Sequence, residues 1–173
     1  MKKLFLTIFF LSIILSVTAQ NENKGIEFHS ISFSPLNVYF SDRDSGFGMN
    51  LDVSFNTGQH IFKVYAGGAS EFGINLGGES INDSFAEYNI LYGRELKIKK
   101  WFGIDFFAGV GSFNFTYDKG SSTESKNNVI GFPLQSEIRF NTGRIFSLGV
   151  QLHSNINSAT TIYQPGIFLQ WKL

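Results

Sequence analysis

The stretch VIGFPLQSEIRF, residues 129–140, places an apolar side chain at almost every second position. The alternation continues after Asn141-Thr142-Gly143-Arg144 in FSLGVQLH (146–153) and again in YQPGIFLQWKL (163–173). Side chains of a β-strand point alternately to the two faces of a sheet, so a period of two predicts strands with one apolar face. The intervening residues are mostly Gly, Gln, Glu, Arg and His. A polar, glycine-rich second face is typical of a membrane barrel that turns its apolar face to lipid.

Five further strand candidates precede these three. They cover residues 26–40, 47–55, 62–74, 86–92 and 102–110. The first is irregular, because its apolar residues change parity twice and Pro35 cannot donate to a β-ladder, so we expect bulges there. The sequence therefore predicts an all-β fold, an eight-stranded antiparallel up-and-down transmembrane β-barrel.

The connections between these strands alternate in length. Short turns are expected at 56–59, 97–100 and 141–144, and longer polar loops at 41–46, 75–84, 118–128 and 155–160. Outer-membrane barrels show the same asymmetry, with short turns on the periplasmic side and longer loops outside.

The first residues have the three parts of a secretory signal peptide. Lys2 and Lys3 precede an apolar run from Leu4 to Val17, and Val17-Thr18-Ala19 places small residues before Gln20. A membrane-spanning helix needs about 20 apolar residues, so we interpret residues 1–19 as a cleaved signal and 20–173 as the barrel. The sequence contains no Cys, which excludes disulfides, thiol chemistry and a lipid-modified cysteine.

Charge excludes one class of partner and bears on the environment of the barrel. Fourteen basic residues balance 14 acidic ones without a basic run, so no nucleic-acid partner is expected. A soluble, lipocalin-like barrel also alternates, but its water-facing side would favour Lys, Glu and Thr over glycine. Only 16% of the residues are charged, against about a quarter in soluble domains, which favours lipid outside.

Large aromatic residues recur on the apolar parity near the ends of the strands. A ring at a membrane interface is a common location for such side chains. We predict an interfacial aromatic girdle near the short turns, formed by Phe55, Phe62, Phe102, Phe140, Phe146 and Trp171. A second ring near the longer loops would contain Phe47, Phe72, Phe132 and Tyr163.

Charged residues of the inward parity gather near the short turns. They are Lys63, Glu95, Asp105, Glu137 and Arg139. An isolated charge inside a barrel is costly, so we expect these side chains to pair in a structural salt-bridge cluster that fills the barrel rather than in a proton or ion relay. Glu71, Glu87 and His153 are expected nearer the other mouth and less constrained.

The last residues, Leu169-Gln170-Trp171-Lys172-Leu173, keep the alternation. With the signal sequence, the eight short strands and the longer loops, the chain resembles the small outer-membrane barrels of the OmpA transmembrane-domain, OmpX and OmpW kind. This resemblance implies an outer-membrane location, contact with outer-membrane lipids and recognition of the last strand by the barrel-assembly machinery. Leu169, Trp171 and Leu173 would be that assembly signal, with Leu173 where the family usually has Phe.

Lipid A deacylases resemble this architecture and use His, Ser and an acid on the lipid-facing surface. In this sequence the neighbours are His153 with Ser154, and His29 with Ser32. Alternation points His153 inward and Ser154 outward, and it also separates His29 from Ser32 unless a bulge intervenes. No acid is expected beside either pair, so we expect no catalytic residues and no enzymatic activity.

Metal and cofactor sites are not expected either. His29, His60 and His153 lie on separate elements without the spacing of metal ligands. Gly109-Val110-Gly111 lacks the third glycine and the following helix of a nucleotide-binding loop.

Three functions remain open. The first is a structural or interaction scaffold with a plugged interior, contacting an envelope partner of unknown identity. The second is a narrow conduit for small apolar molecules, entered through Phe113, Phe115 and Tyr117. The third is a lipid-modifying enzyme.

Overall fold

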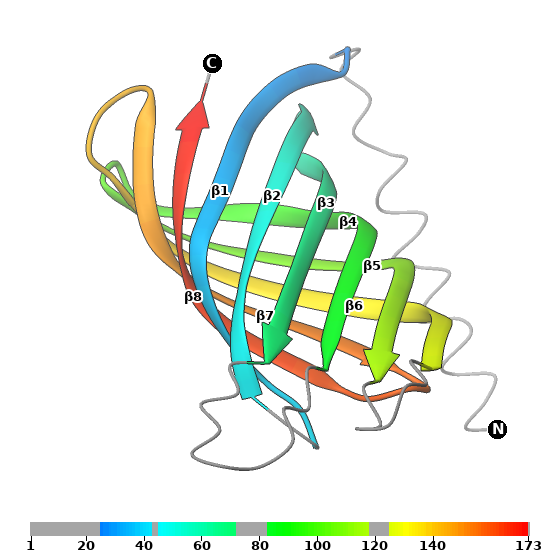
Figure 1. Ribbon diagram of the computed structural model, residues 1–173. Coiled ribbons are helices and arrows are strands. Elements are labelled where there is room, and N and C mark those ends of the chain that lie inside the picture. The colour runs from blue at the N-terminus through cyan, green and yellow to red at the C-terminus, as the bar shows by residue number, and fades with distance from the viewer. Residues whose placement is uncertain (1–24, 43–44, 72–82, 118–124, 173) are drawn as a thin grey trace, which may run out of the picture.

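The computed structural model describes residues 25–42, 45–71, 83–117 and 125–172. These residues form a closed barrel in which each strand pairs antiparallel with the next and β1 pairs with β8 (Figure 1). The predicted fold is confirmed. The strands are β1 Glu27–Phe40, β2 Ser45–Thr57, β3 His60–Glu71, β4 Ser84–Lys99, β5 Phe102–Tyr117, β6 Ser125–Asn141, β7 Phe146–Asn157 and β8 Ile162–Lys172.

The irregularity expected in the first strand is confirmed. The register of β1 against β2 shifts between Phe28 and Ser30 and again between Ser34 and Asn37. Pro35 lies inside the second shift and is not paired with a residue of β2. Its lack of an N–H group therefore removes no hydrogen bond from the ladder. At the β2–β3 turn, Gly58 has φ 62°, a left-handed conformation that glycine adopts without a Cβ clash.

Several strands extend further than their apolar residues indicated. β4 runs to Lys99 and β6 already begins at Ser125, inside segments expected to be a turn and a loop. Pairs such as Lys97 with Gly103 and Asn114 with Asn128 continue the ladder through polar sequence. The hydrogen bonds of a ladder join backbone groups, so pairing extends past the apolar band without help from apolar side chains.

The two faces of the sheet differ as the alternation predicts. On β6, Ile130 and Leu134 face outward and are 66% and 46% exposed, whereas the inward Gln135 and Arg139 are 2% and 1% exposed. The barrel thus has an apolar exterior and a mostly polar interior, opposite to a soluble barrel.

Within the described ranges, no helix has the length and apolar character needed to cross a membrane.

Candidate functional site

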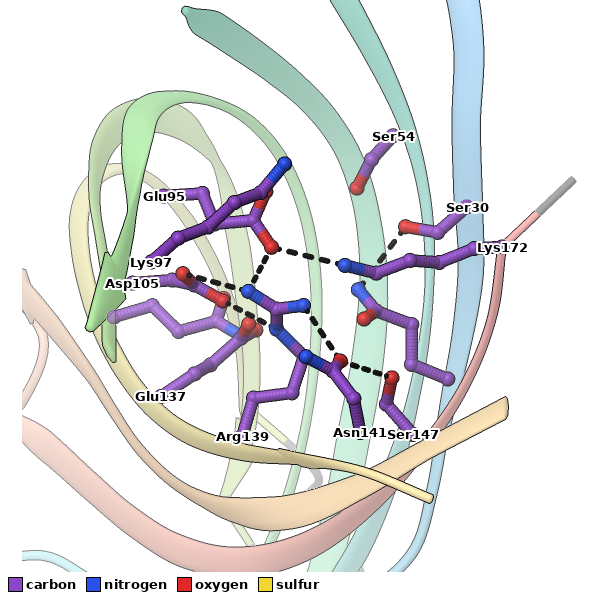
Figure 2. A network of polar contacts seen from close by, with 12 residues as sticks. Ser30, Ser54, Glu95, Lys97, Asp105, Glu137, Arg139, Asn141, Ser147 and Lys172 are labelled. Carbon is purple, nitrogen blue, oxygen red and sulfur yellow. Dashed lines mark hydrogen bonds and ion pairs between the residues drawn. The ribbon is translucent and has the colours of Figure 1, made fainter. Parts of the chain in front are cut away.

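The interior of the barrel contains an extended polar network, and its first layer centres on Arg139 near the short turns (Figure 2). The guanidinium donates two hydrogen bonds to Asp105 on β5, from Nε to Oδ2 at 3.0 Å and from Nη2 to Oδ1 at 3.3 Å. It also contacts Glu95 on β4 and donates from Nη1 to Asn141 Oδ1 at 3.0 Å. Such a bidentate ion pair fixes the orientation of the Arg139 side chain and places its charge beside a carboxylate.

Glu95 extends this layer across the barrel. Its Oε1 lies 2.9 Å from Lys172 Nζ on β8, so the pair spans from one strand to the opposite side of the closed sheet. Lys97 approaches Oε2 at 3.5 Å, but its side chain is 74% exposed. The Lys172 contact lies deeper and is screened less by water than the Lys97 contact.

A second layer is built around Lys63 on β3. Its ammonium contacts Glu137 on β6 and lies 3.6 Å from Asp52 Oδ1 on β2. The same nitrogen sits 4.1 Å from the centre of the Phe107 ring, and Gln135 Nε2 donates to Glu137 Oε1 at 2.7 Å. All of these side chains are buried, so the ammonium and the two carboxylates are held by protein groups rather than by solvent.

Amide side chains continue this layer toward β1 and β7. Gln151 Nε2 donates to Asn50 Oδ1 at 2.7 Å and to Asn37 Oδ1 at 3.2 Å, and Asn37 donates to Asn50 at 2.6 Å. Gln135 Nε2 in turn donates to Gln151 Oε1 at 3.2 Å. A chain of side-chain amides therefore joins the Lys63 layer to β7 and β1.

The third layer corrects the expectation that Glu87 and His153 are less constrained. Both are 0% exposed, and His153 Nε2 lies 3.0 Å from Glu87 Oε1. Tyr65 stacks on the imidazole with ring centres 4.5 Å apart and planes within 5°. The alternation assigned both residues to the interior, but it could not show that β4 and β7 face each other across a narrow lumen.

Amide donors complete the environment of Glu87. Its Oε2 accepts from Asn155 at 2.6 Å and from Asn89 at 2.8 Å, and its Oε1 accepts from Gln164 at 3.3 Å. Hydrogen bonds from these amides offset the cost of burying the carboxylate.

The fourth layer, toward the longer loops, is apolar. It consists of Tyr39, Phe85, Phe113, Phe115 and Ile162, all at most 5% exposed. Phe85 lies edge-on to Tyr39 and stacks on Phe113, with 5.3 Å between ring centres in both pairs. Phe113 and Phe115 therefore fill this end of the lumen, where the conduit hypothesis expected them to line an entrance; the side chain of Tyr117 lies outside the described residues.

Glycines on the inward parity make room for these large side chains. A Cβ on Gly149 would lie 2.7 Å from the ring of Phe168, and one on Gly67 would lie 2.6 Å from the Tyr65 hydroxyl. Such contacts are shorter than van der Waals separation, so the glycines and the rings fit the lumen together.

The structure brings the five predicted interior charges into two groups, Arg139 with Glu95 and Asp105, and Lys63 with Glu137. Sequence reasoning missed Asp52 and Lys172 as their partners. Asp52 has the inward parity of Asn50 and Ser54, and this was a usable signal. Lys172 likewise has the inward parity of Gln170, but parity could not show that its partner Glu95 lies on the opposite strand.

The predicted girdle residues lie on the outer surface near the short turns. Phe102 and Phe140 lie 5.6 Å apart between ring centres, and Phe146 and Trp171 lie 5.5 Å apart. Phe55 packs at 5.9 Å from Phe28. Trp101, which the prediction omitted, stacks on Phe140 at 6.3 Å because the β4–β5 turn carries it beside β6.

Phe62 belongs to the same surface and contacts Tyr92 at 5.3 Å between ring centres. In the second ring, Phe47, Phe132 and Tyr163 are 46–58% exposed. Phe72 lies outside the described residues, as do Leu173 and the signal segment 1–19. Leu169 and Trp171, the described part of the assembly signal, have the outward parity of β8.

The first His/Ser pair is split by the sheet. His153 is buried inside, whereas Ser154 is outward and its hydroxyl donates to the Leu134 carbonyl at 3.4 Å. The expectation that no acid lies beside His153 was wrong, because Glu87 lies there from across the lumen. This acid is on the wrong side of the sheet to assist Ser154.

The other sequence candidates are also placed. His29 lies at the first register shift of β1, and Ser32 is buried on the inward face. His60 is stacked on Tyr92, and its Nδ1 lies 2.5 Å from the Tyr92 hydroxyl. Among the described residues, no group of three His, Asp or Glu side chains is arranged to hold a metal ion.

Comparison with known proteins shows likeness in fold without likeness in sequence. No family model matches the chain, and no curated protein sequence matches it. The structure is similar to Neisserial surface protein A, with a TM-score of 0.71 and 10% identity over 87% of this chain and 100% of that chain.

Two further solved structures share the fold. One is Ail, the attachment invasion locus protein of Yersinia pestis, solved in complex with the heparin analogue sucrose octasulfate (TM-score 0.60, 12% identity, 87% of this chain and 99% of that one). The other is the N-terminal β-barrel domain of Pseudomonas aeruginosa OprF (TM-score 0.54, 10% identity, 83% and 97%). The chain therefore has the fold of the small eight-stranded outer-membrane β-barrels.

Proposed function

We propose that this protein is a closed outer-membrane barrel that serves as a structural or interaction scaffold and does not conduct. The observation that carries the proposal is the succession of buried, mutually bonded side chains along the lumen. Polar layers around Arg139, Lys63 and Glu87 are followed by an aromatic layer around Phe113, and each layer joins strands from different sides of the barrel.

The interior is poorly suited to transport. A conduit needs a path whose groups bind a solute weakly and release it, whereas Lys63, Glu87 and Arg139 are 0–1% exposed and already hold protein partners. Moving Lys63 or Arg139 to open a path would leave buried carboxylates without their partner, which is strongly unfavourable.

The exterior of the barrel supports the proposed membrane location. Outward side chains such as Ile90, Ile130 and Phe132 are 58–66% exposed, and together with their neighbours they form an apolar belt around the closed sheet. A soluble protein rarely exposes so large an apolar surface, whereas lipid covers it in a membrane barrel. Lipids of the outer membrane and the barrel-assembly machinery are the partners we propose on this basis.

The test is single-channel recording in a planar bilayer with the refolded protein. We expect no discrete conductance steps from the unaltered barrel. A double variant, Phe85→Ala with Phe113→Ala, removes two rings of the aromatic layer and reports whether opening that layer is sufficient for ion flow. Well-resolved steps from the unaltered protein would overturn the closed-scaffold proposal.

Folding is checked independently by migration on a gel in detergent, with and without boiling. A folded membrane barrel keeps its compact shape when unboiled and runs faster. Fractionation of cells then tests the location: recovery with the outer membrane supports the proposal, and recovery in a soluble fraction contradicts it.

A further inference from the structure

The outward face of β4 carries a charge that takes no part in the interior networks. Arg94, on β4, is exposed and has the outward parity of Tyr92 and Leu96. Among the outward positions described away from the strand ends, it is the only charged residue. A charged side chain on the lipid face is costly near the middle of a bilayer and inexpensive near its interfaces. The depth of Arg94 therefore decides whether its charge can be accommodated.

The register places Arg94 at the level of the aromatic girdle. Tyr92 pairs with Phe62 across β3 and β4, and the two rings are in contact. Arg94 lies two residues closer to the short turn on the same face, so it is at the girdle rather than deep in the apolar belt. A guanidinium on a long apolar stem reaches the headgroups from such a position.

Arg94 stands at the edge of a groove of about 840 Å³ on the outer surface of β4, β5, β6 and β7. The groove exists because small residues, Ala108, Ser136 and Ser154, lie between larger ones. Cross-strand pairing explains this arrangement. Leu134 on β6 pairs with Ala108 on one side and Ser154 on the other, and Ser136 pairs with Phe106 and Leu152.

We propose that this groove is a binding site for one anionic glycerophospholipid of the leaflet on the short-turn side. The headgroup phosphate pairs with Arg94, and an acyl chain lies in the groove over Ala108. Charge complementarity supports this occupant, because the lining of the groove is mostly apolar and Arg94 is its one charged residue. A phosphate is the natural partner of a guanidinium. The inference rests on the proposed membrane location of the barrel.

The test is native mass spectrometry of the folded barrel released from micelles that contain equal amounts of phosphatidylglycerol and phosphatidylcholine. We expect the unaltered barrel to retain one phosphatidylglycerol in preference to phosphatidylcholine. Arg94→Gln should reduce that preference about fivefold, the factor expected for one cation at an anionic surface. Ala108→Leu, which fills the groove and keeps the charge, should reduce retention of both lipids.

Arg144→Gln is the matched control, because it removes an exposed cation from the β6–β7 turn and leaves the groove intact. This variant should retain the preference. Equal retention of the two lipids by the unaltered barrel, or the same loss in both Arg variants, would overturn the inference. So would a dimer that Arg94→Gln dissociates, since a second copy would then be the occupant. The gel assay shows whether the barrel has folded, so a failed lipid preference in a folded barrel leaves the proposed function standing.

Discussion

The two ends of the lumen are filled by different chemistry. Near the short turns, Arg139 and Lys63 are held by carboxylates from several strands, whereas near the loops Phe113 and its neighbours pack ring against ring. Ion pairs inside a barrel are sensitive to the loss of one partner, because the other charge remains buried. Apolar packing loses contacts in proportion to the atoms removed. The comparison predicts how each end responds to substitution.

The largest effect is expected at Arg139. Arg139→Ala leaves Asp105 and Glu95 without their main partner, and we expect a loss of about 3–5 kcal/mol in the free energy of unfolding. Urea unfolding in detergent, followed by Trp fluorescence, measures it. Lys97→Ala is the matched control: Lys97 also contacts Glu95 but is mostly exposed, so its removal should have little effect. Equal stability of Arg139→Ala and the unaltered protein would show that the layer contributes nothing.

The aromatic layer should respond next. Phe113→Ala removes a fully buried ring and is expected to cost about 3 kcal/mol in the same unfolding experiment. Phe113→Leu retains most of the volume and should recover more than half of the loss. If the leucine variant is as unstable as the alanine variant, ring contacts rather than filled volume hold this end.

An intermediate effect is expected at Glu87. Glu87→Gln keeps the shape but replaces an acceptor by an amide donor that faces Asn89 and Asn155, so about 1–3 kcal/mol should be lost. The urea midpoint gives the value. Ser112→Ala, at an exposed hydrogen bond on β5, is a comparison in which little change is expected. A Glu87→Gln variant more stable than the unaltered protein would contradict the account of the third layer.

The smallest effect is expected at Arg94. Arg94 makes no hydrogen bond or ion pair within the described part of the chain, so the stability of Arg94→Gln in lipid-free detergent should change by less than about 0.5 kcal/mol. The same variant is expected to alter lipid retention, and this separates a ligand-binding role from a structural one. A large loss of stability in detergent would assign Arg94 to the fold.

Most of the fold was predictable because alternation is a local property. Ile130, Leu134 and their neighbours fixed the outward parity of β6, and Pro35 indicated the bulge in β1. The ends of the strands were predicted less accurately. β4 and β6 continue through polar residues, because backbone pairing does not require apolar side chains.

The candidate site was predictable in composition but not in its pairing. Inward parity and approximate height selected Lys63, Glu95, Asp105, Glu137 and Arg139. The pairing of these charges depends on the stagger of the strands around the closed sheet. A local sequence pattern does not specify this stagger. The contact of Lys172 with Glu95, and that of His153 with Glu87, therefore emerged only from the structure.

The sequence by itself determined that this chain forms strands with an apolar face and a small, polar face, because side-chain direction alternates with every residue. The tertiary structure alone decided how the lumen is filled and where Arg94 stands on the outer surface. Closure of the sheet brings opposite strands within side-chain reach, and the register between strands sets the height of each residue.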